Sequence, residues 1–302
     1  MQTRRALGEV ATATRVFQAS CKPKSATNRL CSSPLWRNSA FLSSHPFFST
    51  SAKQGSSSSS SDNHPSSSSS LYPNHVQLSP FQKALMTFGS AFMALARPER
   101  MDMVAALGET TGDYALGQML QAMRKDPEGQ EILLERPRVR ENSVDLEMLS
   151  KLPAGSFGKE YVEWLRAEGF SPDKRPQVRF VDDEELAYVM TRYREVHDFL
   201  HLLVGLPPTV LGEIALKWYE MYQMSYKASF PLPMSVLSSF VGPLRLSFSE
   251  QSELRSKYIP WAKASAQQTP HFFMNIYYER LFEENLEELR KRMRIVPFPG
   301  VM

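Results

Sequence analysis

Cysteine is nearly absent from this 302-residue chain, and its two cysteines lie near the N-terminus at Cys21 and Cys31. The chain beyond Cys31 therefore has no disulfide, no thiolate nucleophile, no cysteine-bound zinc and no iron–sulfur cluster. Long apolar runs are absent as well, so no transmembrane helix is predicted. The most apolar segment, Phe230 to Phe248, contains three prolines and an arginine, which a regular helix across a bilayer would not tolerate.

Acidic residues are scarce in the first 61 residues, which contain eight basic residues and only one acid, Glu9. A basic segment rich in Ser, Ala and Thr is typical of an organelle transit peptide. Its first arginines lie among apolar residues and can form a basic amphipathic helix, which favours the mitochondrion. The sequence therefore predicts a mitochondrial transit peptide over residues 1–50, a Ser-rich disordered linker over 51–72 and one helical metal-binding domain over 73–302.

The charge balance changes when this leader is set aside. The whole chain has 35 basic and 32 acidic residues and a net charge of +3. Taking away the leader's eight basic residues and one acid leaves a net charge of −4. The pI of about 8.8 therefore belongs largely to the targeting segment, and no nucleic-acid partner is predicted.

Hydrophobic periodicity predicts that the rest of the chain is all-α, a single-domain helical bundle. Apolar residues at helical spacing over 81–95 indicate one helix, and a weaker helix containing three glycines is predicted over 101–124. Val178 to Val181 is the only predicted strand. The last helix is expected to turn its charged residues, including Arg290, to water and to bury Phe282, Leu286, Leu289 and Met293.

The clearest predicted element is a helix that begins after Asp182, with Glu185 in a capping-box relation, and ends at Gly205. A second helix is predicted to begin at Pro207-Pro208-Thr209 and to run to about Lys227. Because only a short turn joins them, the two helices are expected to form an antiparallel pair.

This helix pair contains the most informative motif, His197-Asp198-Phe199-Leu200-His201, followed twelve positions later by Glu213. At about 100° per residue, His197, Asp198 and His201 share one sector of the first helix. That sector overlaps the apolar stripe, so these polar groups need partners in the core. Glu213 lies about one turn past the bend and can meet them. Two nitrogens and two or three oxygens with open positions suit zinc, manganese or ferrous iron.

Other interpretations of this region stay open. The same side chains can form a buried hydrogen-bonded cluster without a metal. The spacing is also similar to the zinc-protease pattern His-Glu-x-x-His, in which the acid is a general base, although Asp198 is one methylene shorter than Glu. Tyr193, one turn before His197, is a candidate proton donor or a core tyrosine. Lys217 is expected to pair with Glu213 in an i,i+4 salt bridge.

Taken in order, these motifs resemble a known family, that of the fourth coenzyme Q (ubiquinone) biosynthesis protein of mitochondria. The resemblance covers essentially all of residues 75–295, and its signature is His-Asp-x-x-His, eleven residues, then Glu. The other matching stretches are Phe180 to Val189, Arg192 to His197, Leu211 to Ile214, Gly242 to Leu246, Ile259 to Ala262 and Tyr277 to Arg280.

The resemblance implies an all-helical protein bound peripherally to the matrix side of the mitochondrial inner membrane, in a complex with other ubiquinone biosynthesis enzymes. It implies loss of the C1 carboxyl group from a polyprenylated 4-hydroxybenzoate, with a divalent metal usually taken as Zn²⁺. Carried over position by position, the metal ligands are His197, Asp198, His201 and Glu213. Glu213 and Tyr193 are the candidate proton donors, and a homo-oligomer is compatible with the same features.

A non-catalytic alternative belongs to another class of protein, a lipid-binding scaffold that organises the biosynthesis complex around a structural metal. The helix 81–95 and the segment 230–248 are expected to pack in the core. Their Met and Phe content also suits a lipid tunnel or a membrane surface. A structural metal is fully ligated by protein, whereas a catalytic metal keeps a position for water, so the coordination separates the two functions.

Overall fold

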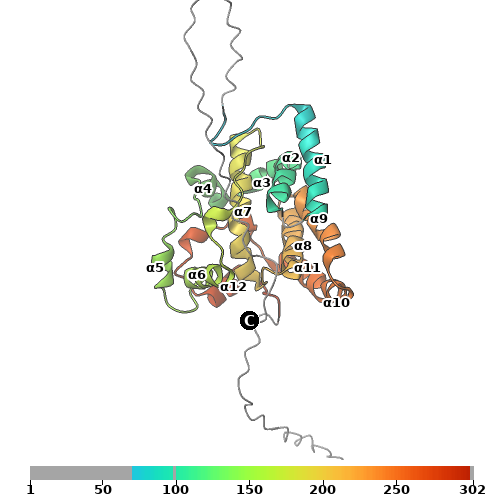
Figure 1. The fold of residues 1–302 in the computed structure, drawn as a ribbon. Coiled ribbons are helices and arrows are strands. Elements are labelled where there is room, and N and C mark those ends of the chain that lie inside the picture. The colour runs from blue at the N-terminus through green and yellow to red at the C-terminus, as the bar shows by residue number, and fades with distance from the viewer. Residues whose placement is uncertain (1–69, 98–99, 300–302) are drawn as a thin grey trace, which may run out of the picture. The chain divides into compact units, whose positions relative to one another are not determined.

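The computed structural model describes residues 70–97 and 100–299 (Figure 1). Within these ranges the chain forms α-helices joined by turns and by longer irregular segments and contains no strand, which confirms the predicted all-α fold. The predicted transit peptide and most of the predicted linker lie outside the described residues. The helices are α1 Pro80–Ala96, α2 Met101–Thr111, α3 Asp113–Arg124, α4 Pro127–Glu135, α5 Leu146–Ser150, α6 Phe157–Glu168, α7 Glu184–Val204, α8 Val210–Lys227, α9 Pro233–Val241, α10 Phe248–Glu253, α11 Ile259–Gln268 and α12 Leu286–Met293.

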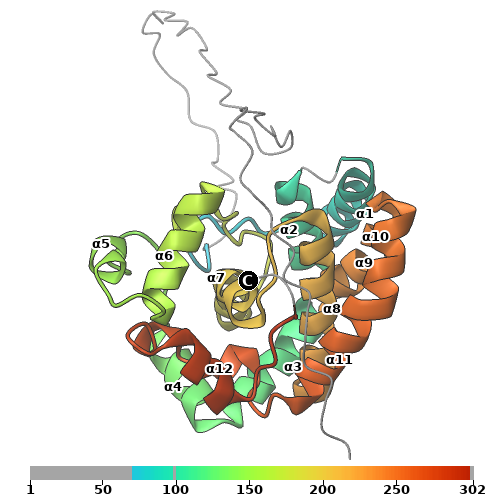
Figure 2. The ribbon, with the colours of Figure 1, turned by 90° about the horizontal axis from the view of Figure 1, so that it is seen from below.

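Helix α7 lies at the centre of the domain, and the other helices form a ring around it (Figure 2). With 21 residues it is about 30 Å long. Ala187, Val189, Met190 and Phe199 of α7 are all buried, although they point in different directions around the helix. A helix enclosed on most sides must give every polar side chain a partner. The histidines of α7 are therefore in a place where their ring nitrogens have to be satisfied.

The ends of α7 and the start of α8 are set by local contacts. Asp183 caps α7, because its side chain accepts a hydrogen bond of 2.8 Å from the backbone N–H of Leu186. The predicted cap, Asp182, is wrong. Gly205 ends α7 in the left-handed conformation, with φ of 67°, as predicted. Thr209 then caps α8, which confirms the predicted turn between the two helices.

Two other predicted elements are wrong. The predicted strand Val178 to Val181 is irregular chain with a bend at Phe180, and the backbone N–H groups of Arg179 and Phe180 donate to the carboxylate of Glu109 at 2.8 Å each. The carboxylate of Glu109 thus accepts the hydrogen bonds that the carbonyl groups of a neighbouring strand would otherwise accept. The predicted helix 101–124 is two helices, because the chain turns at Gly112.

Helix α12 buries its apolar residues as predicted, but Arg290, expected to face water, is buried as well. Its guanidinium donates to the backbone carbonyl oxygens of Leu202 at 2.5 Å and Leu203 at 3.0 Å. Carbonyl groups in the last turn of a helix have no partner within that helix. Arg290 therefore ties α12 to the end of α7.

Helix α1 departs furthest from expectation. Its apolar stripe was expected to pack in the core, but Phe81, Leu85, Phe88 and Phe92 are all exposed. The opposite side of α1 packs on α2. No helix in the described part of the chain is both long enough and apolar enough to cross a membrane.

Candidate metal centre

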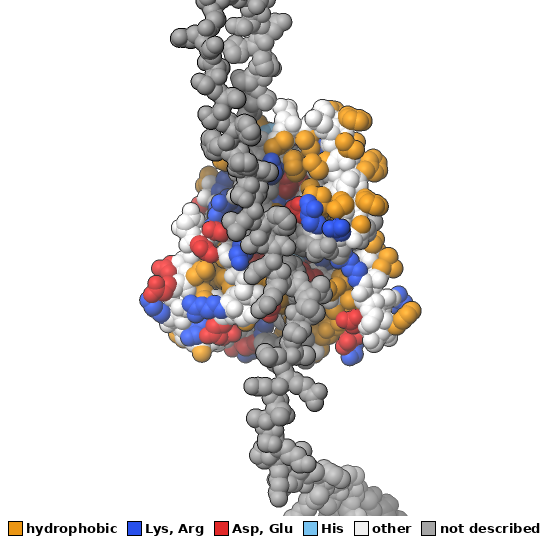
Figure 3. Space-filling model, viewed as in Figure 1, with side chains coloured by type: hydrophobic (Ala, Val, Ile, Leu, Met, Phe, Trp, Pro, Cys, Tyr) orange, Lys and Arg blue, Asp and Glu red, His pale blue; other side chains and the backbone are white. Residues whose placement is uncertain are grey.

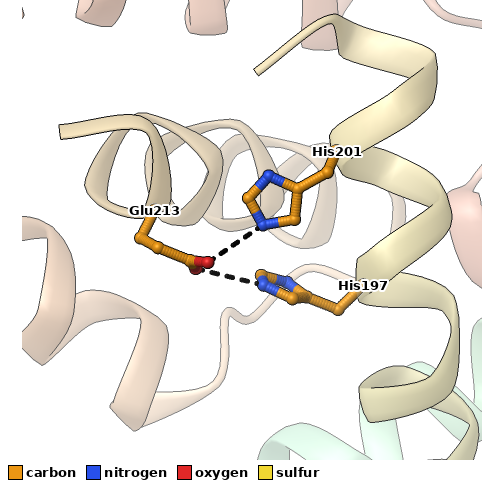
Figure 4. Close-up of side chains that lie close together, drawn as sticks. All are labelled: His197, His201 and Glu213. Atoms are coloured by element: carbon orange, nitrogen blue, oxygen red, sulfur yellow. Dashed lines mark hydrogen bonds and ion pairs between the residues drawn. The ribbon is translucent and has the colours of Figure 1, made fainter. Parts of the chain in front are cut away.

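Three of the predicted ligands meet between α7 and α8 (Figure 4). Nε2 of His197 lies 3.2 Å from Oε2 of Glu213, and Nε2 of His201 lies 3.1 Å from Oε1 of the same carboxylate. A tetrahedral ion with bonds of ~2.1 Å would hold its ligand atoms ~3.4 Å apart. Each imidazole nitrogen is therefore about as far from its carboxylate oxygen as two ligands of one ion would be, and the three residues offer ligand atoms within 4.8 Å of one another.

Glu213 reaches this position because α8 starts very close to the chain that leads into it. A Cβ atom on Gly212 would lie only 2.0 Å from the carbonyl oxygen of Pro207, so no other residue fits without moving one of the two segments. The cap at Thr209 begins the helix at the same place. Together these contacts fix the register of Glu213 against His197 and His201.

The second nitrogen of each imidazole is already bonded. Nδ1 of His197 lies 2.6 Å from Oε1 of Glu220, and Nδ1 of His201 lies 3.0 Å from the carbonyl oxygen of Leu206. Such contacts orient the rings of metal-bound histidines and leave Nε2 for the ion. Nε2 of His201 is buried and forms no hydrogen bond of proper geometry, although Glu213 is close. A cation between the three groups would satisfy it, so these residues fit a divalent metal.

A buried polar cluster lies behind His197, and its acidic member, Glu220, was not identified from the sequence. Nζ of Lys217 lies 2.7 Å from Oε2 of Glu220 and 3.0 Å from the hydroxyl of Tyr193. The prediction that Lys217 pairs with Glu213 is therefore wrong. Glu220 follows Glu213 by seven residues, which places both on one face of α8. That spacing was the available signal for it.

Tyr193, the other candidate proton donor, is fully buried within this cluster. Its hydroxyl donates to Glu220 and lies 2.9 Å from Oγ of Ser235. Burial, with the negative charge of Glu220, raises the pKa of Tyr193 above its ordinary value. The hydroxyl thus contacts the residue that holds His197 rather than the three candidate ligands themselves.

The charges of the cluster shift the pKa values of its members. Burial and Lys217 both act to lower the pKa of His197, but Glu220 and Glu213 outweigh them and raise it to about 9. Burial acts to raise the pKa of Glu220, yet Lys217 and His197 lower it to about 2. Against the same effect of burial, the two histidines hold the pKa of Glu213 well below its ordinary value. At neutral pH, the metal-free site therefore has a protonated His197 between two carboxylates.

Zinc binding to the metal-free protein is expected to release about one proton at neutral pH. The pKa of His197 is raised to about 9, so its imidazole must lose a proton before it can bind an ion. Zinc affinity should therefore rise with pH up to about 9 and change little above that. Titration calorimetry in buffers of different ionisation enthalpy measures the released protons. An affinity that does not vary with pH between neutrality and pH 9 would contradict this prediction.

Asp198 does not join the other three residues. Its Oδ2 contacts the guanidinium of Arg175, whose Nε lies 3.1 Å away. Arg175 is held in turn by the backbone carbonyl oxygens of Val139 and Pro172. Asp198 as a fourth metal ligand stays a prediction.

The candidate centre is closed on one side and open on the other. The side chain of His201 is 1% exposed, whereas that of Glu213 is 41% exposed. Three grouped protein ligands with solvent at the remaining side is the arrangement of catalytic zinc sites, and structural zinc sites are closed by four protein ligands. The carboxylate of Glu213 is therefore the solvent-facing side of the centre.

The fold and the site define an all-helical protein with a candidate metal centre on one antiparallel helix pair. The family model described as the coenzyme Q (ubiquinone) biosynthesis protein Coq4 matches residues 72–299. The chain therefore belongs to this family of ubiquinone biosynthesis proteins.

Named relatives agree with this assignment. The human ubiquinone biosynthesis protein COQ4 homolog, mitochondrial, is 49% identical over 229 residues, which are 76% of this chain and 84% of that protein. The proteins of the same name from Danio rerio and Nematostella vectensis are 48% and 49% identical, covering 74% and 68% of this chain and 80% and 97% of their own lengths. Their mitochondrial names support the location predicted from the leader.

A solved structure has a similar fold. The crystal structure of a protein from Nostoc punctiforme superimposes with a TM-score of 0.55 and 22% sequence identity, covering 70% of this chain and 95% of that one. At this identity the likeness concerns the fold alone.

Proposed function

We propose that this protein is a carboxy-lyase, which removes the C1 carboxyl group from a polyprenylated 4-hydroxybenzoate intermediate of ubiquinone biosynthesis in a metal-dependent reaction. The observation that carries the proposal is the group formed by His197, His201 and Glu213, spaced for a divalent ion and open to solvent at the carboxylate. Zn²⁺ is the proposed ion, because imidazole and carboxylate are among its usual ligands. As the family resemblance implies, the protein works at the matrix side of the inner membrane with other ubiquinone biosynthesis enzymes.

The chemistry follows from the substrate class. An ion bound there would fix the substrate carboxylate and polarise the ring. C1 first accepts a proton, or, if the reaction is oxidative, is attacked by an electrophilic oxygen species that serves as a two-electron oxidant. The hydroxyl group para to C1 stabilises the dearomatised ring that forms in either case. Carbon dioxide then leaves, and the electron pair of its bond to C1 restores the aromatic ring.

The protein must therefore hold the ring and control a proton. Glu213 is ionised at neutral pH because its pKa is so low, so it suits a ligand or a proton acceptor better than a proton donor. Tyr193 as the donor stays a prediction, and its proton would have to pass through Glu220 and His197. Tyr193→Phe and Glu213→Gln separate these roles. Full metal content with full turnover in either variant removes that residue as the acid.

The proposed reaction is tested with a short-chain prenylated 4-hydroxybenzoate that carries carbon-13 in its carboxyl group. The zinc-loaded protein in detergent is expected to release labelled carbon dioxide, and folded His197→Ala is expected to release none above background. The mass of the product shows whether C1 gains hydrogen or oxygen. If the folded, zinc-loaded wild type releases no label, even with its partner enzymes present, the proposal is wrong.

The alternative function is a non-catalytic scaffold that binds lipid, organises the complex and uses its metal only structurally. The exposed apolar side of α1 favours it, because such a surface suits contact with lipid. X-ray absorption at the zinc edge distinguishes the two functions. A scaffold is expected to have four protein ligands, with Asp198 the candidate for the fourth, whereas a catalytic site keeps a bound water.

A further inference from the structure

Helix α1 exposes its apolar side and packs its other side on the domain, which is the reverse of an ordinary surface helix. Phe81, Leu85, Phe88 and Phe92 follow one another at spacings of four, three and four residues, so they form one stripe. All four point away from the domain, and Phe81 and Phe88 are 78% and 76% exposed. Among the α1 side chains that the structure describes, Ser90 alone is buried. A surface helix normally buries its large apolar residues, so this stripe is a surface made for contact.

The apolar surface continues past the end of α1. Arg245, in the short helix Gly242–Arg245, lies beside α1, with its guanidinium 3.4 Å from the carbonyl oxygen of Ala94. Leu244 and Phe248 on either side of it are 79% and 92% exposed. Figure 3 shows hydrophobic side chains gathered along the edge of the domain where Figure 1 places α1 and, below it, α9 and α10. We call the four residues of the α1 stripe, with Leu244 and Phe248, the apolar edge.

The two segments that form the apolar edge have charges of one sign. Neither α1 nor residues 230–249 contain Asp or Glu, and the next acid along the chain is Glu250. Lys83 near the start of α1 is paired with Asp113 of α3 at 2.6 Å. Arg97 just past the end of α1 is exposed, and Arg245 lies 3.4 Å from the carbonyl oxygen of Ala94 near the same end. Apolar segments that contain cations and no acids of their own are complementary to anionic lipid headgroups above an acyl layer.

A second copy of the chain fits this edge less well, because two copies would bring cationic borders of the same sign against each other. An anionic bilayer meets these cations with charge of the opposite sign, and it covers whatever apolar side chains reach into it.

We propose that the apolar edge is the membrane-docking surface of this protein, with α1 lying in the plane of an anionic bilayer and its phenylalanines among the acyl chains. The inference deepens the proposed inner-membrane location, on which it rests for the identity of that bilayer. It is independent of the reaction, since the edge shares no residue with the candidate metal centre.

The test compares the full chain with a Phe88→Asp/Phe92→Asp variant on vesicles of phosphatidylcholine and phosphatidylglycerol. The wild type is expected to float with the vesicles, and the variant to bind about tenfold more weakly or worse. Leu134→Asp is the matched control, because Leu134 is 84% exposed on α4, at the other side of the domain in Figures 1 and 2. It should bind as the wild type does. The basic leader is the same in all three proteins, so a difference between them belongs to α1.

Three results would overturn the proposal. The wild type fails to bind vesicles; the double variant binds as well as the wild type; or the wild type sediments as a dimer without lipid while the variant is a monomer, which would assign the edge to a second copy. Carbon dioxide release in detergent is measured in parallel and should be equal in wild type and double variant. Vesicle binding by a wild type that releases no carbon dioxide, even with its partner enzymes present, would support the docking surface and reject the proposed reaction.

Discussion

Replacing His201 by glutamine is expected to weaken zinc binding by about a hundredfold or more. Zinc sites with four protein ligands bind with ~10–16 kcal/mol, so each ligand contributes roughly 3 kcal/mol, or about two powers of ten. Glutamine is close in size to histidine, and its amide can donate to the carbonyl of Leu206 as Nδ1 does now. The variant therefore loses the Nε2 ligand without leaving a cavity. Competition with a zinc chelator of known affinity measures the loss.

The loss of zinc affinity in two further variants can be compared with the loss in His201→Gln. Glu220→Gln keeps a hydrogen-bond partner for His197 but removes its charge, and should cost between tenfold and a hundredfold, as is common for residues that hold a ligand. Asp198→Asn tests the fourth ligand. A loss as large as that of His201→Gln would identify Asp198 as a ligand, and a loss below tenfold would leave it as the partner of Arg175. Wild-type affinity in His201→Gln would contradict the candidate centre itself.

Replacing Arg192 by methionine is expected to lower the free energy of unfolding by roughly 3–5 kcal/mol, as for other broken buried ion pairs. Arg192 is fully buried in α7 and forms a two-armed contact with Glu279, with a further hydrogen bond of 3.0 Å to the carbonyl of Ile276. Methionine fills much of the space but leaves the mostly buried carboxylate of Glu279 without its cation. For a domain of this size the melting temperature should fall by roughly 10 °C.

Arg124→Met is the matched control for this prediction. Arg124 pairs with Glu185 at 2.6 Å, but both side chains are nearly half exposed. Solvent-exposed pairs of this kind contribute about 0–1 kcal/mol, so the melting temperature should change little. Equal effects in Arg192→Met and Arg124→Met would show that burial does not make the central pair important. Circular dichroism measures the free energy of unfolding of both variants in denaturant and their melting temperatures on heating.

Much of the α7–α8 pair could be predicted because its signals are local. Gly205 and the cap at Thr209 act on their own neighbours along the chain, and the spacing of His197, His201 and Glu213 follows from helix geometry and a short turn. The same reasoning favours Asp182 as the cap, because Glu185 stands three positions after it, whereas Leu186 stands three positions after Asp183. In the structure Asp182 instead contacts His75 at 3.1 Å, a tertiary contact that local spacing does not show.

Other features depend on residues far apart in the sequence. Periodicity showed that α1 has an apolar side, but it does not say which side meets the domain. The sequence predicts a strand over Val178 to Val181. In the structure, backbone N–H groups of this segment donate to Glu109, about 70 residues earlier, and local sequence does not show that contact. Asp198 follows His197 directly, yet Arg175 determines where its carboxylate lies.

The close approach at Gly212 has a consequence for how inherited variants in this family are interpreted. A glycine has no side chain that can bind a metal or a substrate, and its replacement by alanine counts as conservative in most substitution scores. Here the added methyl group would collide with the carbonyl of Pro207 and push the start of α8, with Glu213 next in the chain, away from the histidines. A chain with such a change would keep every candidate ligand and is still expected to lose their arrangement. Distance along the backbone from Glu213 is therefore a better guide to damage here than chemical similarity.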